Sequence, residues 1–404
     1  ATICAITIAN SPWSASYAAF WHTQIGVSVG GVEYTRSVKH WINDGLMSLF
    51  FFTVALELKR ELVVGELQDF RIAALSLAGA LGGMLVPPML YLAAAGGGPA
   101  AHGWGTVTAT DTAFLVGCMA VLGRRVPLSL RLFLLSLAIF DDVGAILVVA
   151  IGYSGAINWL GIALVVVGML LVYLLSKIGV RSVAAYLGIG VFIWLALELA
   201  GIHPTLTGII LGFMASTRRW VSDSRLQAIL QDVRPSSAGK QGPAKLTRAN
   251  LKRAQIATKE ALSPVEQLEA ALHPWVAYMV MPLFALANAD VAWRSGDLDF
   301  SLVTATVLGL AFGKPLGVIL FSAIAVRGRL AALPADLSWS VLVGGSFLTG
   351  IGFTMALFIA ELAYEPGLLG SAKVGITIAS IISAAAGIGA LLALSRSRPD
   401  VGLR

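Results

Sequence analysis

Long apolar stretches recur along the whole chain and constrain its fold more than any other feature. Of the 404 residues, 57% are hydrophobic and only 12% are charged, whereas soluble proteins carry about 25% charged residues. Stretches of about 17 to 25 apolar residues are long enough to cross a bilayer as helices. The sequence therefore predicts an all-α polytopic membrane protein with about a dozen crossings and no separate soluble domain.

The crossings follow from the apolar stretches. The short apolar segment Ala1–Ala9 is read as the tail of a first helix, because it cannot span a bilayer alone. The other crossings are predicted at roughly 40–63, 74–95, 101–122, 130–153, 159–176, 182–200, 204–216, 265–289, 302–325, 339–362 and 371–394.

Basic residues orient the chain, since Lys and Arg gather in the cytoplasmic loops of membrane proteins. The connections 95–105 and 154–159 carry no Lys or Arg, whereas the alternate connections are basic. The basic positions include Lys59, Arg60, Arg71, Arg124, Arg125, Lys177, Arg181, Arg327, Arg329, Arg396 and Arg398. We therefore expect the C-terminal tail, 395–404, to lie in the cytoplasm. The net charge of +6 is then a topology signal, and no interleaved basic and aromatic pattern indicates nucleic-acid binding.

Two segments interrupt the apolar pattern. In 24–37, alternating apolar residues flank Gly30-Gly31, which predicts a small β-hairpin on the outer side. Because a hairpin offers free strand edges, it is a candidate for self-association, with a simple outer loop as the alternative. The segment 218–263 has ten Lys or Arg against three Asp or Glu. It is predicted to be a basic cytoplasmic linker, with binding to anionic lipid headgroups as a second possibility.

Charged residues lie near the middle of three crossings. Asp111 lies in 101–122, Lys314 in 302–325, and the adjacent Asp141 and Asp142 in 130–153. A charge at the bilayer centre costs about 2.5 to 3.5 kcal/mol on insertion scales and usually marks function. Charges at equal depth can meet, and three carboxylates against one ammonium form a site that favours a cation or protons.

The two adjacent aspartates are expected to have different roles. Neighbouring residues on a helix point about 100° apart, so both cannot face one ion squarely. We expect one to coordinate a hard cation through oxygen and the other to pair with Lys314 on a neighbouring crossing. A purely structural salt bridge between Asp141 and Lys314 is the alternative.

Two crossings are predicted to break. Asp111 stands in the threonine-rich segment 108–112, and the segment 344–352 is rich in glycine; both are weak helix formers. Each lies in the middle of a three-crossing group, 74–153 and 302–394, which is the arrangement of an inverted repeat. Close glycine-mediated helix packing is the alternative for the second segment.

Several ordered motifs resemble the NhaA-type Na+/H+ antiporters over nearly the whole chain. They are Trp41-Ile-Asn-Asp-Gly-Leu-Met47, Glu57-Leu-Lys-Arg-Glu61, Ala109-Thr-Asp-Thr-Ala-Phe114, Asp141-Asp-Val-Gly-Ala145, His273-Pro-Trp275, Gly313-Lys-Pro-Leu-Gly317 and Gly350-Ile-Gly-Phe-Thr-Met355. The aspartate pair and the lysine motif are the most specific of these.

The resemblance implies a bacterial inner-membrane protein of twelve helices, with an inverted repeat and two broken helices that cross at the midplane. It also implies electrogenic exchange of Na+ or Li+ for H+ without a cofactor, and dimerisation through the hairpin. The chain would divide into 1–73 (first helix remnant, hairpin and second helix), 74–158 (first transport repeat), 159–301 (interface helices and linker), 302–394 (second transport repeat) and the tail 395–404.

Site residues carry over by motif. Asp141 and Asp142 occupy positions similar to those of the family's ion and proton site, which would hold the metal cation. Asp111 and Thr110 lie at the broken helices, and Lys314 partners Asp141; Asp111 is equally consistent with a structural role at helix ends.

A cluster for pH sensing is also implied, with Glu57, Arg60, Glu61, Glu269 and His273 in the similar positions. Ordinary surface ion pairs are the alternative for these residues. Ala270 stands where the family has a histidine, so the sequence does not define the pH set-point.

Two other functions need buried carboxylates. An intramembrane aspartyl protease would place them on separate helices, and its common Gly-x-Gly-Asp signature is absent. A cation channel would use a continuous water-filled path. Adjacent aspartates on one helix favour ion exchange over both, so the chain is predicted to be a transporter and not an enzyme.

Overall fold

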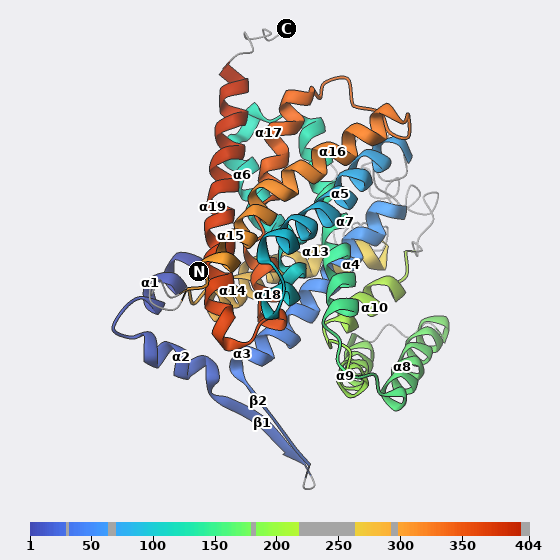
Figure 1. Cartoon of the computed structure of the whole chain (residues 1–404). Coiled ribbons are helices and arrows are strands. Elements are labelled where there is room, and N and C mark those ends of the chain that lie inside the picture. Colours follow the sequence, from blue (N-terminus) through green and yellow to red (C-terminus); the bar gives the residue numbers. More distant parts are fainter. Residues whose placement is uncertain (30–31, 64–69, 179–182, 218–262, 292–297, 397–404) are drawn as a thin grey trace, which may run out of the picture.

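The computed structural model describes residues 1–29, 32–63, 70–178, 183–217, 263–291 and 298–396, and these residues are mostly helical (Figure 1). The α-helices are α1 (Thr2–Ala9), α2 (Ser14–His22), α3 (Val38–His40), α4 (Met47–Val63), α5 (Phe70–Ala95), α6 (Thr112–Leu122), α7 (Leu128–Gly152), α8 (Trp159–Ile178), α9 (Val183–Ala200), α10 (Leu206–Met214), α13 (Pro264–Trp275), α14 (Met281–Asn288), α15 (Phe300–Val307), α16 (Lys314–Arg327), α17 (Trp339–Thr349), α18 (Phe353–Ala363) and α19 (Pro366–Arg396).

Short irregular helical turns join several of these helices. Three π-helical turns, η1 (Trp41–Leu46), η5 (Val276–Val280) and η6 (Leu308–Gly313), join α3 to α4, α13 to α14 and α15 to α16. Two 3₁₀ segments, η3 (Pro99–Val107) and η4 (Gly123–Arg125), precede α6 and α7.

Within the described residues, seven continuous helices are long and apolar enough to cross a membrane, or up to nine spans if each of two bent pairs counts as one. The seven are Val38–Val63, Ala73–Ala95, Leu128–Gly152, Trp159–Ile178, Pro264–Asn288, Phe300–Arg327 and Pro366–Arg396. The chain is therefore a multi-pass membrane protein, as its composition predicted.

Two further helices fall on predicted crossings but are not among these seven spans. The helix α9 has an apolar stretch of Ala184–Ala200, close to the predicted 182–200, and the nine residues of α10 lie inside the predicted 204–216. Nine residues rise only about 14 Å, roughly half the bilayer core. Gly201, with a positive φ, follows α9, and hydrogen-bonded turns at His203, Pro204 and Thr205 lead into α10.

Both crossings that were predicted to break do so. The pair η3 and α6 bends by 45°, and the pair α17 and α18 bends by 44°. The breaks fall within 108–111 and 350–352, where threonine and glycine replace strong helix formers.

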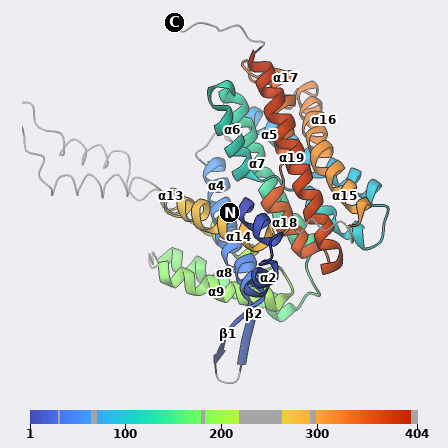
Figure 2. The same cartoon turned by 90° about the vertical axis from the view of Figure 1, so that its left-hand side faces the viewer.

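The predicted hairpin is also present. Strand β1 (Gln24–Val29) pairs antiparallel with β2 (Val32–Ser37), in the register Gln24 opposite Ser37. Figures 1 and 2 show it projecting from the end of the molecule opposite the C-terminal end of α19. The turn 30–31, most of the predicted linker 218–263 and most of the tail 395–404 lie outside the described residues.

Apolar packing joins helices that are far apart in the sequence. One buried cluster combines residues of α5, α6, α7, α16, α17 and α19. A separate cluster holds α8, α9 and α10 together, and these helices stand beside the main bundle in Figure 1. The charged crossings thus share one packed body, which brings their polar residues together.

Candidate ion-binding site

The two broken helices touch each other at their breaks. The backbone N–H of Asp111 donates to the carbonyl oxygen of Ile351 at 2.6 Å. The hydroxyl of Thr110 lies 2.8 Å from the carbonyl oxygen of Thr349. Because a broken helix leaves backbone groups without intrahelical partners, these contacts satisfy part of what the breaks expose.

Asp111 lies between the amino ends of both C-terminal half-helices. Its Oδ1 accepts from the N–H of Phe114 in α6 at 3.1 Å, and its Oδ2 accepts from the N–H of Thr354 in α18 at 2.8 Å. The Thr354 hydroxyl also donates to Oδ2. A carboxylate at a helix amino end is stabilised by the helix dipole, so one buried charge compensates two helix ends.

Asp141 and Lys314 form an ion pair inside the protein. Lys314 Nζ lies 2.7 Å from Asp141 Oδ2, and both side chains are 0% exposed. Lys314 also donates to the carbonyl oxygen of Thr108, and the Thr110 hydroxyl lies 2.6 Å from Asp141 Oδ2. The pairing predicted from the sequence is therefore present, and it ties α7 and α16 to the first break.

Asp142 has a different environment. It is 3% exposed, and its Oδ2 accepts from the hydroxyl of Thr112 at 3.1 Å. Its Oδ1 is buried without a hydrogen-bond partner, as is Oδ1 of Asp141. Among the described residues no Lys or Arg lies within ion-pair distance of Asp142. The site thus contains carboxylate oxygens that a bound cation or proton would satisfy.

Close packing of α5 against α16 fixes the position of Lys314. A Cβ built on Gly317 would lie 2.1 Å from the carbonyl oxygen of Gly82, and one built on Gly82 would meet Gly317 equally closely. Only glycine allows these two backbones to approach so closely. The π-helical turn η6 immediately before Lys314 sets the direction in which α16 begins, and such turns are frequent at functional sites.

Several partners of the charged residues were not identified as such from the sequence. They are the hydroxyls of Thr112 and Thr354 and the carbonyl groups of Thr108 and Thr349. The threonine content of both breaks was the available signal, but hydrogen-bond partners between breaks depend on how the helices cross.

The structure brings the predicted pH-sensing residues close together: Glu57 interacts electrostatically with Arg60, Glu61 and His273, and Glu269 interacts with Glu57, Arg60 and Glu61. Arg60 on α4 lies 2.7 Å from Glu61 and 2.8 Å from Glu269 on α13. Glu57 is half-buried one turn before Glu61, and His273 is exposed on α13. Oε2 of Glu269 is buried without a hydrogen-bond partner. The Glu269 carboxylate is thus more buried than the carboxylate of an ordinary surface ion pair, which was the alternative interpretation.

The described part of the chain contains no cluster of three or more His, Cys, Asp or Glu side chains arranged to hold a metal ion. The buried site is instead a group of carboxylates, threonine hydroxyls and backbone carbonyls around two helix breaks. Hard monovalent cations bind oxygen ligands of this kind. The fold and the site together define a multi-pass membrane transporter.

Comparison with known proteins agrees with this class. The family model described as "Na+/H+ antiporter 1" matches residues 1–391. The Na(+)/H(+) antiporter NhaA of Rhizobium meliloti (strain 1021) is 54% identical over 98% of this chain and 90% of its own length. NhaA 2 of Acidiphilium cryptum (strain JF-5) is 52% identical over 98% and 89%, and NhaA 2 of Vibrio vulnificus (strain CMCP6) is 50% identical over 96% and 87%. The chain belongs to the NhaA family of Na+/H+ antiporters, whose members are transporters and not enzymes.

Proposed function

We propose that this protein exchanges Na+ or Li+ for H+ across the bacterial inner membrane by alternating access. The observation that carries the proposal is the pair of adjacent buried aspartates, of which only Asp141 has a cationic partner among the residues that the structure describes. A carboxylate without a counter-charge in a low-dielectric site is stable when it binds either a proton or a cation. Cation and proton therefore compete for the same oxygens.

Asp142 is the main ligand in this mechanism. A cation that approaches its free Oδ1 displaces the proton, and the hydroxyl oxygen of Thr112 can turn a lone pair toward the ion. Asp141 contributes its free Oδ1 while Lys314 holds Oδ2. Release of the cation to one side and of protons to the other completes the exchange.

Net charge moves in each cycle if more than one proton is exchanged for one cation. Asp142 carries the first proton. The second resides on Asp141 or on Lys314, which share one short contact and so titrate as a coupled pair. Asp111 and Thr110 shape the site at the crossed breaks, and Asp111 stabilises the helix ends rather than carrying a proton.

The architecture proposed for this activity is a twelve-helix inverted repeat. The segments 74–158 and 302–394 each contain a broken helix at the centre, and the two breaks contact each other. The segments 1–73 and 159–301 form the flanking part. The basic loops orient the hairpin outward and the tail 395–404 toward the cytoplasm.

Regulation and assembly complete the proposal. Arg60, Glu61 and Glu269 couple α4 to α13, and with Glu57 and His273 they adjust activity to pH. The hairpin 24–37 joins two copies of the chain edge to edge, and anionic lipids contact the basic segment 218–263. No cofactor is required.

The test uses purified protein in proteoliposomes. Addition of Na+ should collapse a preset pH gradient, and an imposed proton gradient should drive 22Na+ against its own gradient. A channel would only dissipate both gradients, and a protease would cleave peptide without transporting ions. The Asp142→Asn variant serves as the inactive control. Failure of the wild-type protein to couple the two gradients would refute the proposal.

A further inference from the structure

A second group of charged residues lies on the hairpin side of the molecule. Lys39 of α3 lies 2.7 Å from Glu361 of α18, and the same Glu361 oxygen lies 2.7 Å from Lys373 of α19. Lys373 also pairs with Asp290, which follows α14. Two cationic and two anionic side chains therefore alternate in one row of ion pairs, Lys39–Glu361–Lys373–Asp290, which we call the ionic chain.

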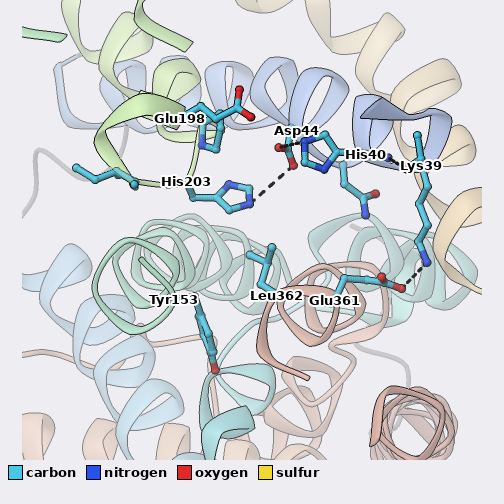
Figure 3. A pocket seen from close by; sticks show the side chains of 13 residues that line it. Lys39, His40, Asp44, Tyr153, Glu198, His203, Glu361 and Leu362 are labelled. Atoms are coloured by element: carbon cyan, nitrogen blue, oxygen red, sulfur yellow. Dashed lines mark hydrogen bonds and ion pairs between the residues drawn. The ribbon is translucent and has the colours of Figure 1, made fainter. Parts of the chain in front are cut away.

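The ionic chain lies at the edge of a cavity of about 410 Å³. Lys39 and Glu361 line one side of this cavity, while Asp44 and His203 face them from the other side (Figure 3). The side chains of Lys39 and Glu361 are 12% and 13% exposed. These charges are thus mostly withdrawn from water, where ion pairs are stronger than at an open surface.

The ionic chain joins two parts of the fold. Its middle members, Glu361 and Lys373, belong to the second transport repeat proposed above, 302–394. Its end members lie outside that repeat, because Lys39 leads into α4 and Asp290 ends the span of α14. Another ion pair on this side, Arg36 with Glu198 at 2.7 Å, joins the hairpin to α9 and does not touch the repeat.

We propose that the chain Lys39–Glu361–Lys373–Asp290 is an ionic latch that holds the transport repeats against the flanking helices on the hairpin side of the membrane. The proposal rests on alternating access as proposed above. In that cycle the repeats must separate from the flanking helices on one side to admit ions, and separation on the hairpin side breaks both end contacts of the latch.

The end contacts of the latch and its central pair behave differently when the repeats separate from the flanking helices. When Lys39 and Asp290 withdraw, Glu361 and Lys373 still neutralise each other at 2.7 Å. The transport repeat is therefore not left with an unpaired buried charge, which would make opening prohibitively unfavourable. The end contacts set the balance between the two conformations, and the central pair keeps the repeat intact in both.

The first test measures opening directly. In protein whose own cysteines, Cys4 and Cys118, are replaced by serine, a thiol introduced by Leu362→Cys reports access to the cavity. Lys39→Met combined with Asp290→Asn should raise its rate of labelling by a hydrophilic maleimide about tenfold, because weakened end contacts shift the conformational equilibrium. The Arg36→Gln variant is the matched control and should label at the rate of the parent.

The second test holds the cavity closed. A short bis-methanethiosulfonate reagent, which forms a reducible disulfide with each cysteine thiol and releases sulfinate, is reacted with a protein carrying Ile202→Cys and Leu362→Cys, which lie on the lining of the cavity and leave all four latch residues in place. Crosslinking should stop Na+/H+ exchange, and reduction should restore it.

The outcomes separate the two proposals. Unchanged labelling in the double variant, or full exchange by the crosslinked protein, would overturn the latch while leaving the exchange function intact. A wild-type protein that does not exchange the ions at all would instead overturn the proposed function and the latch with it.

Discussion

Two buried charged groups in the described part of the chain differ in their balance. Asp141, Asp142 and Asp111 share the interior with one lysine, Lys314, and two carboxylate oxygens have no partner. The ionic chain on the hairpin side pairs two acids with two bases. A balanced group can hold helices together without binding anything. An unbalanced group is stabilised when ions occupy it, so the imbalance supports the proposal that this group is the transport site.

The largest effect is expected at the unbalanced group. Asp142→Asn should reduce exchange in proteoliposomes to the level of empty liposomes, because it removes the titratable group with little change in volume. The protein should still fold and elute as the wild type does in size-exclusion chromatography. Glu365→Gln, at an exposed position, is the control. Normal exchange by the Asp142 variant would contradict the assignment.

The second prediction concerns the one lysine of the site. Lys314→Met should lower the free energy of unfolding by about 3 to 5 kcal/mol, since it leaves the Asp141 carboxylate buried without its partner. Thermal unfolding in detergent measures the loss. Adding Asp141→Asn should restore much of the stability, and an equally unstable double variant would show that the pair is not the cause. Exchange that survives in the single variant would assign Lys314 a structural role only.

The third prediction concerns pH and the cavity beside the ionic chain. Burial lowers the pKa of His203, in the loop before α10, from 6.5 to about 4. The folded state therefore holds this histidine neutral while the unfolded state binds a proton below pH 6.5. The contribution of His203 to stability should be complete above that pH and be lost, by about 3 kcal/mol, between pH 6.5 and 4.

Thermal unfolding measured across this pH range tests the assignment. His203→Gln should flatten the slope, because glutamine does not titrate. A slope that is unchanged in this variant would assign the pH dependence to other groups. His40, whose positive charge opposes protonation of His203, is the natural second substitution.

The smallest effect is expected in the balanced group. Lys39→Met should cost about 1 kcal/mol of stability, because Glu361 keeps Lys373 as a partner at 2.7 Å. The same thermal unfolding assay compares it with Lys314→Met. A loss as large as that at Lys314 would mean that both groups are equally dependent on one lysine, and the contrast between them would fail.

Prediction from the sequence succeeded where a residue's effect is local. Apolar length gave the spans, the alternation around two glycines gave the hairpin, and threonine and glycine gave both helix breaks. It placed a crossing at 204–216, where α10 lies but has only nine helical residues. It did not identify Glu361 and Lys373, because each lies near the end of an apolar stretch and resembles an ordinary interfacial charge.

The amino-acid sequence by itself determined that the chain enters a membrane and which buried charges require an explanation, because insertion depends on the composition of each segment alone, and its basic loops predict the orientation. Only the tertiary structure decided that the hydroxyl of Thr110 and the carbonyl group of Thr108 complete the pair of Asp141 with Lys314, and that Asp111 joins two helix ends. Those choices depend on where helices far apart in the sequence cross and on atoms within about 3 Å of one another, which no single segment encodes.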